Sequence, residues 1–162
     1  MIIINGLQGT GKTTLAKKIS EALDYDYIND YEILKNGCFD SVTITNLNKN
    51  QKSILNQFIE NNVNKKIVLD MCYSLPINLL KKYNSQVKII VLGFANIDPK
   101  ILQSEMQKKS QQKIFLTTAK SLIRRSQQTK IECESSNLTF HEIGKNREEI
   151  INNIFNQLKN EA

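Results

Sequence analysis

The chain has 162 residues, of which 40% are hydrophobic and 23% charged, which suits one compact domain and excludes a disordered chain. Its formal net charge is +6. The basic residues are scattered in short pairs such as Lys17-Lys18, without interleaved aromatic residues, so we do not expect a nucleic-acid partner.

Cysteine spacing and hydropathy predict where the protein works. The three cysteines lie far apart, with one histidine in the chain, and this pattern excludes a structural zinc site. The opening apolar run is too short for a signal peptide, and no apolar run reaches membrane-spanning length. We therefore expect a cytoplasmic protein with reduced thiols and no membrane partner.

Short apolar runs alternate with amphipathic stretches, and no repeat or linker divides the chain. In chain order we expect strands at 2–4, 25–28, 66–70, 87–92 and 138–143, and helices at 12–23, 51–63, 76–83, 122–133 and 146–158. A polar, Lys- and Gln-rich region covers 98–120. Strands separated by helices pair in parallel through right-handed crossovers, so the pattern predicts a three-layer α/β fold in a single domain, 1–162.

A phosphate-binding loop connects the first strand to the first helix. The sequence Gly6-Leu7-Gln8-Gly9-Thr10-Gly11-Lys12-Thr13 matches the pattern G-x-x-x-x-G-K-[ST]. Glycines let successive backbone N–H groups point at phosphate oxygens, and the helix N-terminus adds its positive dipole end. The motif predicts a nucleoside triphosphate held by Gly6, Gln8, Gly9, Thr10, Gly11, Lys12, Thr13 and Thr14. Lys12 would reach the β- and γ-phosphates, and Thr13 would ligate Mg²⁺.

The tighter form of this loop, Gly6-x-x-Gly9-x-Gly11-Lys12-Thr13-Thr14, resembles the P-loop kinases of small molecules. These include the nucleoside monophosphate, shikimate and gluconate kinases, and the stretch from Arg124 to Phe140 is similar to uncharacterised bacterial P-loop kinase-like proteins. The resemblance implies an α/β/α P-loop NTPase fold, a five-stranded parallel sheet in the order 2-3-1-4-5, and a small helical lid at about 98–125.

Two carboxylates stand at the ends of predicted strands, in positions where the kinases that this chain resembles carry functional aspartates. Asp70 ends the strand Lys-Ile-Val-Leu-Asp, where the Walker B aspartate supports Mg²⁺. Asp30 fits the second aspartate of the shikimate-kinase pattern, although Ile28 stands where the first would be. Asp30 would orient or deprotonate an acceptor hydroxyl, or would cap the helical segment 31–34, and both roles stay open.

The remaining candidates follow the fourth strand. Arg124 and Arg125 end the expected lid, and a guanidinium there would neutralise charge on the transferred group. Adjacent helical residues diverge by about 100°, so at most one of the two is expected to face the nucleotide. Asn146 lies in the loop after the fifth strand, where such folds contact the base, and is equally suited to cap the last helix.

These patterns together predict an ATP-dependent kinase with Mg²⁺ and a small-molecule acceptor, such as a nucleoside or nucleotide, acting as monomer or homodimer. No arginine precedes Arg124, which disfavours a carboxylate or monophosphate acceptor unless lysines substitute. The chain lacks the Asn-Lys-x-Asp motif of a GTPase, and Met71 replaces the glutamate of an ATPase engine. The alternative is a nucleotide-binding module or an ATPase without such an acceptor.

Overall fold

The computed structural model of the chain describes residues 1–36, 47–73, 75–144 and 146–161. Its strands are β1 (Ile2–Gly6), β2 (Asp26–Asn29), β3 (Ile67–Met71), β4 (Lys88–Gly93) and β5 (Phe140–Glu142). Its helices are α1 (Lys12–Leu23), α2 (Asp30–Asn36), α3 (Lys49–Asn62), α4 (Ile77–Lys82), α5 (Pro99–Lys109), α6 (Leu116–Ser135) and α7 (Arg147–Glu161).

The strands form one parallel sheet in the order β2-β3-β1-β4-β5, and this confirms the predicted fold class. β1 lies at the centre, where Ile4 pairs with Asp70 of β3 and with Ile90 of β4. Asn29 at the end of β2 also pairs with Asp70. The carboxyl ends of these strands therefore meet at one edge, which is where ligands bind in open α/β sheets.

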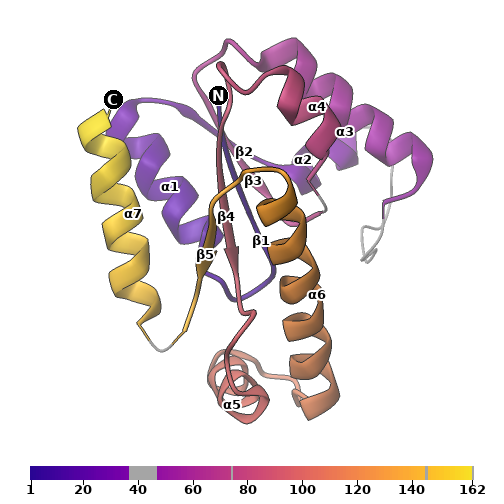
Figure 1. Cartoon of the computed structure of the whole chain (residues 1–162), viewed down its shortest axis with the longest axis vertical. Coiled ribbons are helices and arrows are strands. Elements are labelled where there is room, and N and C mark those ends of the chain that lie inside the picture. The colour runs from indigo at the N-terminus through magenta and orange to yellow at the C-terminus, as the bar shows by residue number, and fades with distance from the viewer. Residues whose placement is uncertain (37–46, 74, 145, 162) are drawn as a thin grey trace.

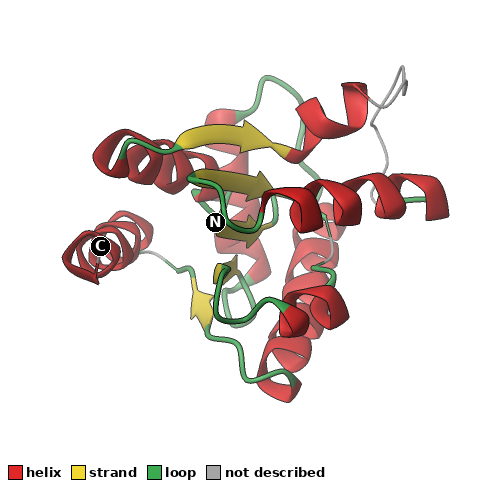
Figure 2. Cartoon of the chain, turned by 90° about the horizontal axis from the view of Figure 1, so that it is seen from above, coloured by secondary structure: helices red, strands yellow, loops and turns green. Residues whose placement is uncertain are grey.

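Alternate side chains of the central strand enter two different cores. Ile2 and Ile4 pack with residues of α1 and α7, whereas Ile3 packs with residues of α3 and α4. Because side chains alternate across a strand, a strand buried on both faces reads as an unbroken apolar run. Figures 1 and 2 show the resulting layers, with helices on both sides of the sheet and α6 running along β4 and β5.

The polar stretch after β4 is more helical than the sequence predicts. Asp98 caps α5 by accepting from the N–H groups of Lys100 and Ile101, and Pro99 occupies the first turn. The next helix begins at Leu116 rather than at 122, because Ala119 and Ile123 are buried against the core. The expected lid segment thus contains α5 and the first half of α6.

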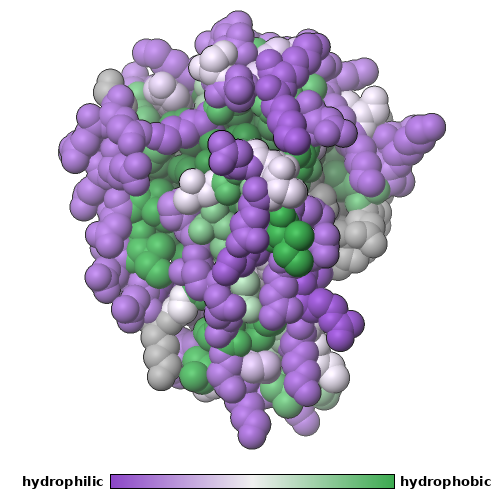
Figure 3. Space-filling model, in the orientation of Figure 1, coloured by the Kyte–Doolittle hydropathy of each residue, from purple (hydrophilic) through white to green (hydrophobic). Residues whose placement is uncertain are grey.

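Hydrophilic residues dominate the face of the molecule in Figure 3, and hydrophobic residues show there only in small, interrupted areas. Within the described ranges, no helix combines the length and the apolar composition that crossing a bilayer requires. The apolar side chains are instead used in the two cores on either side of the sheet.

Candidate active site

The phosphate loop takes its shape from three glycines. Gly9 and Gly11 have φ values of 87° and 89°, in the left-handed region that side chains disfavour. A Cβ on Gly6 would lie 2.7 Å from Thr10 Oγ1 and 2.8 Å from the Leu92 carbonyl oxygen. No side chain caps α1 at Gly11, so the N–H groups of its first turn are available to an anion.

Lys12, Thr13 and Asp70 form a compact polar cluster beside this loop. Lys12 Nζ lies 3.2 Å from Asp70 Oδ1, and Thr13 Oγ1 donates to Asp70 Oδ2 over 2.6 Å. Lys12 is 8% exposed and Asp70 3% exposed. Burial acts to lower the pKa of the Lys12 ammonium, but the Cys72 thiol and the Asp70 charge outweigh burial and raise that pKa. Lys12 is therefore a permanent positive charge at the loop.

The same cluster has the chemistry of a magnesium site. Mg²⁺ is usually held by one or two carboxylates together with substrate phosphates and water, rather than by a cage of protein ligands. Asp70 Oδ1 is buried and lies within ion-pair distance of Lys12, yet no donor of the described chain is aligned to hydrogen-bond it. In the described ranges, no group of three His, Cys, Asp or Glu side chains could enclose a metal. The donor set therefore fits Mg²⁺ only as a partner of bound phosphate.

Tyr27 is a member of this cluster that the sequence analysis missed. Its hydroxyl donates to Asp70 Oδ2 over 3.0 Å. Tyr27 belongs to β2, which lies on the other side of β3 from the central strand β1. Burial first, and then the Asp70 charge, raise the pKa of Tyr27 to about 12. The phenol therefore remains a donor at neutral pH, and it fixes the orientation of the Asp70 carboxylate.

Replacing Tyr27 by Phe should weaken metal binding without unfolding the protein. We expect the Mg²⁺ concentration that half-saturates nucleotide turnover or binding to rise by about tenfold, because Asp70 loses one orienting donor. Tyr25→Phe is the matched control, since Tyr25 packs against the core on the same segment. An unchanged Mg²⁺ dependence in Tyr27→Phe would show that Asp70 does not rely on this hydrogen bond.

Asp30 lies at the junction of β2, α2 and β3. Its Oδ2 accepts from the Cys72 N–H over 2.6 Å, and the residue is 4% exposed. Burial raises the pKa of Asp30, the Asp70 charge adds to the rise, and the Cys72 N–H and Lys12 charge oppose it. The helix cap offered as the alternative role for Asp30 comes instead from Asn29, whose Oδ1 accepts from the Glu32 N–H. The Asp30 carboxylate is thus held by the Cys72 N–H and lies within electrostatic influence of Lys12 and Asp70.

Two adjoining cavities extend from the loop toward α5 and α7. The first, of about 710 Å³, is bordered by Gln8, Gly9, Gly11, Lys12, Thr13 and Thr14. The second, of about 490 Å³, has apolar walls that include Phe94, Ile101 and Met106. They share Gly9, Lys109, Arg147 and Glu148, so a polar compartment at the loop continues into an apolar recess. A nucleoside triphosphate has matching parts, since its phosphates are polar and charged and its base is largely apolar.

The structure separates the predicted loop residues into two groups. Six of them border the first cavity, whereas Thr10 is fully buried and its hydroxyl donates to the Leu7 carbonyl over 2.8 Å. Gly6 borders a different cavity, next to α6. Thr10 and Gly6 therefore shape the loop, and the other six form the surface that a phosphate would meet.

Arg147 and Asn146 lie at the start of α7, beside the apolar recess. Asn146 borders this recess, and its carbonyl accepts from the Ile150 N–H, as an N-cap residue does. Arg147 was not predicted as a site residue. Its Nη1 donates to the Gly9 carbonyl over 3.1 Å, so it links α7 directly to the phosphate loop.

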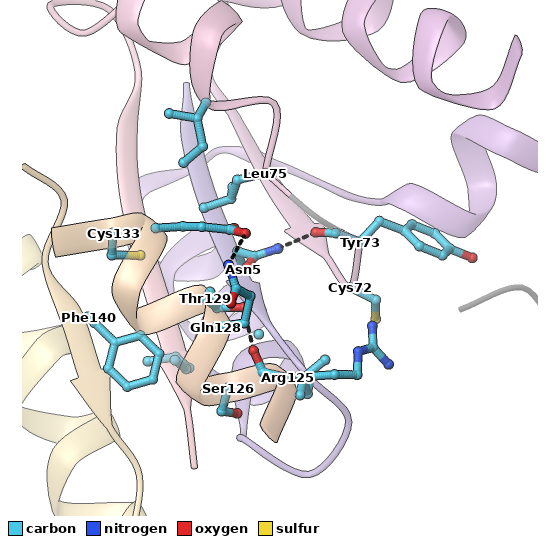
Figure 4. Close-up of a pocket in the computed structure, with 15 residues that line it drawn as sticks. Asn5, Cys72, Tyr73, Leu75, Arg125, Ser126, Gln128, Thr129, Cys133 and Phe140 are labelled. Carbon is cyan, nitrogen blue, oxygen red and sulfur yellow. Dashed lines mark hydrogen bonds between the residues drawn. The ribbon is translucent and has the colours of Figure 1, made fainter. Parts of the chain in front are cut away.

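The two adjacent arginines of α6 are oriented differently. Arg124 is exposed to solvent, whereas Arg125 is half-buried and borders a cavity that also includes Cys72. Figure 4 shows the side chains of Arg125 and Cys72 pointing toward one another in this cavity. Of the two predicted arginines, the structure brings only Arg125 toward the site.

Comparisons with known proteins bear on the family and the fold of the chain. A family model described as an AAA domain matches residues 2–152 of the chain. A search of curated proteins found no match.

Several solved structures share the fold over almost the whole chain. The YorR protein of Bacillus subtilis, in complex with phosphorylated GDP, is 16% identical, with a TM-score of 0.64 over 99% of this chain and 97% of that one. Shikimate kinase from Bacteroides thetaiotaomicron is 15% identical, with a TM-score of 0.63 over 98% and 97%. A gluconokinase from Sinorhizobium meliloti 1021 is 17% identical, with a TM-score of 0.60 over 99% and 93%. At these identities the likeness shows a shared fold, that of the P-loop kinases.

Proposed function

The chain belongs to the AAA domain family that matches residues 2–152, and from this premise we propose that it is an ATP-dependent kinase acting on a small molecule. One observation carries the proposal. Two buried carboxylates flank one cavity: Asp70 lies 3.2 Å from Lys12, and Asp30 is held by the N–H of Cys72, which borders this cavity together with Lys12. One carboxylate suffices to support a metal, and the second is available to an acceptor.

The donor would occupy the two adjoining cavities beside the loop. Its phosphates would meet Lys12, Thr13 and the N–H groups of the loop, and its base would enter the apolar recess next to Asn146. Lys12 would hold the β- and γ-phosphates, while Asp70 and Thr13 would hold Mg²⁺. When bound, Mg²⁺ supplies charge neutralisation at the β- and γ-phosphates.

The segment 98–125 would act as the lid of this site. α5 ends with Lys108 and Lys109, and Lys109 borders both donor cavities. Arg125, further along α6, borders the neighbouring cavity. Closure of this segment would exclude water and add positive charge around the transferred group.

We propose that the enzyme acts in the cytoplasm as a monomer or homodimer.

Phosphoryl transfer to a pooled set of acceptors tests the proposed function. Purified protein would be incubated with Mg²⁺ and γ-labelled ATP, and with pools of nucleosides, nucleotides, sugars and oligonucleotides in turn. A labelled product in one pool supports a kinase. ATP hydrolysis that no pool changes would indicate an ATPase, and binding of ATP without turnover would indicate a nucleotide-binding module.

Asp30→Asn should separate the acceptor step from nucleotide binding. We expect kcat to fall roughly a hundredfold while the Kd for ATP is unchanged, because Asn retains an oxygen for the Cys72 N–H but cannot accept a proton. Isothermal titration and initial rates measure the two quantities. Asp26→Asn is the matched control, because Asp26 is an exposed carboxylate on the strand that leads to Asp30.

The pH profile of the unmodified enzyme tests the same role. A general base must be ionised, so activity should fall as the pH is lowered through the pKa of Asp30. Because burial raises the pKa of Asp30, this loss should occur above the ordinary aspartate value of about 3.9. The acid limb should disappear in Asp30→Asn. An identical limb in both proteins would contradict the assignment of Asp30.

A further inference from the structure

Two more cavities adjoin the phosphate loop, on the side of the acceptor carboxylate. The first, of about 200 Å³, lies between the end of β1 and α6 and includes Gly6, Cys72 and Arg125. The second, of about 540 Å³, lies between α3, the connection after β3, and α6. They share Tyr73, Leu75, Ile77 and Glu132, so together they form one recess leading away from the loop. We call this the acceptor recess.

The acceptor recess and the donor cavities meet at Cys72. Its side chain borders both the phosphate cavity and the first part of the acceptor recess. Its N–H is also the donor that holds the Asp30 carboxylate. Asp30 is therefore held beside the point where a group leaving the phosphate cavity would enter the acceptor recess.

Two cations and one exposed carboxylate border the acceptor recess. Arg125 is in its first part and Lys52 in its second, while the carboxylate of Glu132 borders both parts. Gln128 donates to Glu132 Oε1 over 3.2 Å, which orients this carboxylate, and Figure 4 shows Gln128 among the residues around the recess. The other polar groups around it are uncharged. A carboxylate at the junction repels an anionic acceptor and accepts hydrogen bonds from hydroxyl or amino groups.

The two carboxylates distinguish between classes of acceptor. A phosphate acceptor presents an oxygen that is already anionic, so it needs no base such as Asp30. A neutral hydroxyl must lose its proton during transfer, and Asp30 is a base held at the transfer point.

We propose that the acceptor is an uncharged hydroxyl compound, a nucleoside or a polyol, bound with its polar groups on Glu132. This inference rests on the proposed kinase function. The acceptor oxygen bonds to the γ-phosphorus while the bond from that phosphorus to the β–γ bridging oxygen breaks. The hydroxyl proton passes to Asp30, and ADP leaves.

Acceptor pools sorted by charge test the proposal. With Mg²⁺ and γ-labelled ATP, the protein would be offered neutral nucleosides, neutral polyols, nucleoside monophosphates and hydroxycarboxylates separately. Labelled product in either neutral pool supports the proposal and identifies the source. Product only from monophosphates or carboxylates overturns it while leaving the kinase function intact. No product from any of these pools overturns this proposal, and the kinase function falls with it only if the oligonucleotide pool also gives no product.

Glu132→Gln then tests the recognition of the neutral acceptor. We expect the KM for the acceptor to rise about tenfold, with the KM for ATP unchanged, because the lost hydrogen bond is to a charged oxygen. Glu134→Gln is the matched control, since Glu134 is exposed on the same helix, as Glu132 is, but borders neither part of the recess. An unchanged acceptor KM in Glu132→Gln would overturn the assignment of Glu132.

Discussion

Lys12→Ala is expected to lower kcat/KM by about a thousandfold or more. The ammonium is buried beside the loop and carries a raised pKa, so it acts as a fixed positive charge where the γ-phosphate gains negative charge. Alanine supplies neither this charge nor a hydrogen-bond donor. Initial rates of phosphoryl transfer measure the loss, and Lys65→Ala, an exposed lysine before β3, should behave as the unmodified enzyme.

The same substitution leaves Asp70 buried without its counter-charge, so the stability of the variant must be measured alongside its activity. Thr13 and Tyr27 still donate to this carboxylate, which limits the cost. Lys12→Arg keeps the charge and should keep the Tm, yet its larger planar group should still impair transfer. Near-normal transfer by a folded Lys12→Ala protein would contradict the proposed function.

Asp70→Asn is expected to produce the second-largest loss. Asn matches the shape of Asp and keeps an oxygen for Thr13 and Tyr27, but it removes the negative charge that a cation requires. We expect the apparent affinity for Mg²⁺ to fall by about tenfold to hundredfold and kcat to fall roughly a hundredfold. When Mg²⁺ is limiting, the observed rate is lowered by both factors together.

Initial rates over a Mg²⁺ titration measure both effects of Asp70→Asn. Asp26→Asn again serves as the control, because it removes a carboxylate on the neighbouring strand without touching the cluster. High Mg²⁺ should restore part of the activity of Asp70→Asn, since weak binding is overcome by mass action. If the variant follows the same Mg²⁺ dependence as the unmodified enzyme, Asp70 does not support the metal.

The features that local sequence determines were predicted well. Buried parallel strands are unbroken apolar runs, so the sheet could be recognised from runs such as the one that begins at Ile2. The loop from Gly6 to Thr14 is a contiguous motif, and Asp70 lies near the carboxyl end of β3 at the same edge. The helix α5 was missed because only Leu102 on it is buried, which leaves too sparse a stripe to detect.

Other parts of the site depend on contacts between distant segments. Arg147 reaches the Gly9 carbonyl across 138 positions of the chain, and Tyr27 reaches Asp70 across 43. Neither residue belongs to a motif, and a tyrosine in a strand ordinarily packs in a core. The different exposures of Arg124 and Arg125 likewise depend on how α6 packs against β4. Helical spacing predicts that the two side chains diverge, but not which of them points toward the site.

The hydrogen bond from Arg147 to the Gly9 carbonyl makes the last helix part of the donor site. α7 also completes the core around α1, since Ile151, Ile154 and Leu158 pack with the residues of that helix. A C-terminal truncation would therefore loosen the phosphate loop and open the core in the same step. Loss of activity on deleting α7 would therefore reflect loss of structure. Only point substitutions can assign a chemical role to the residues of this helix.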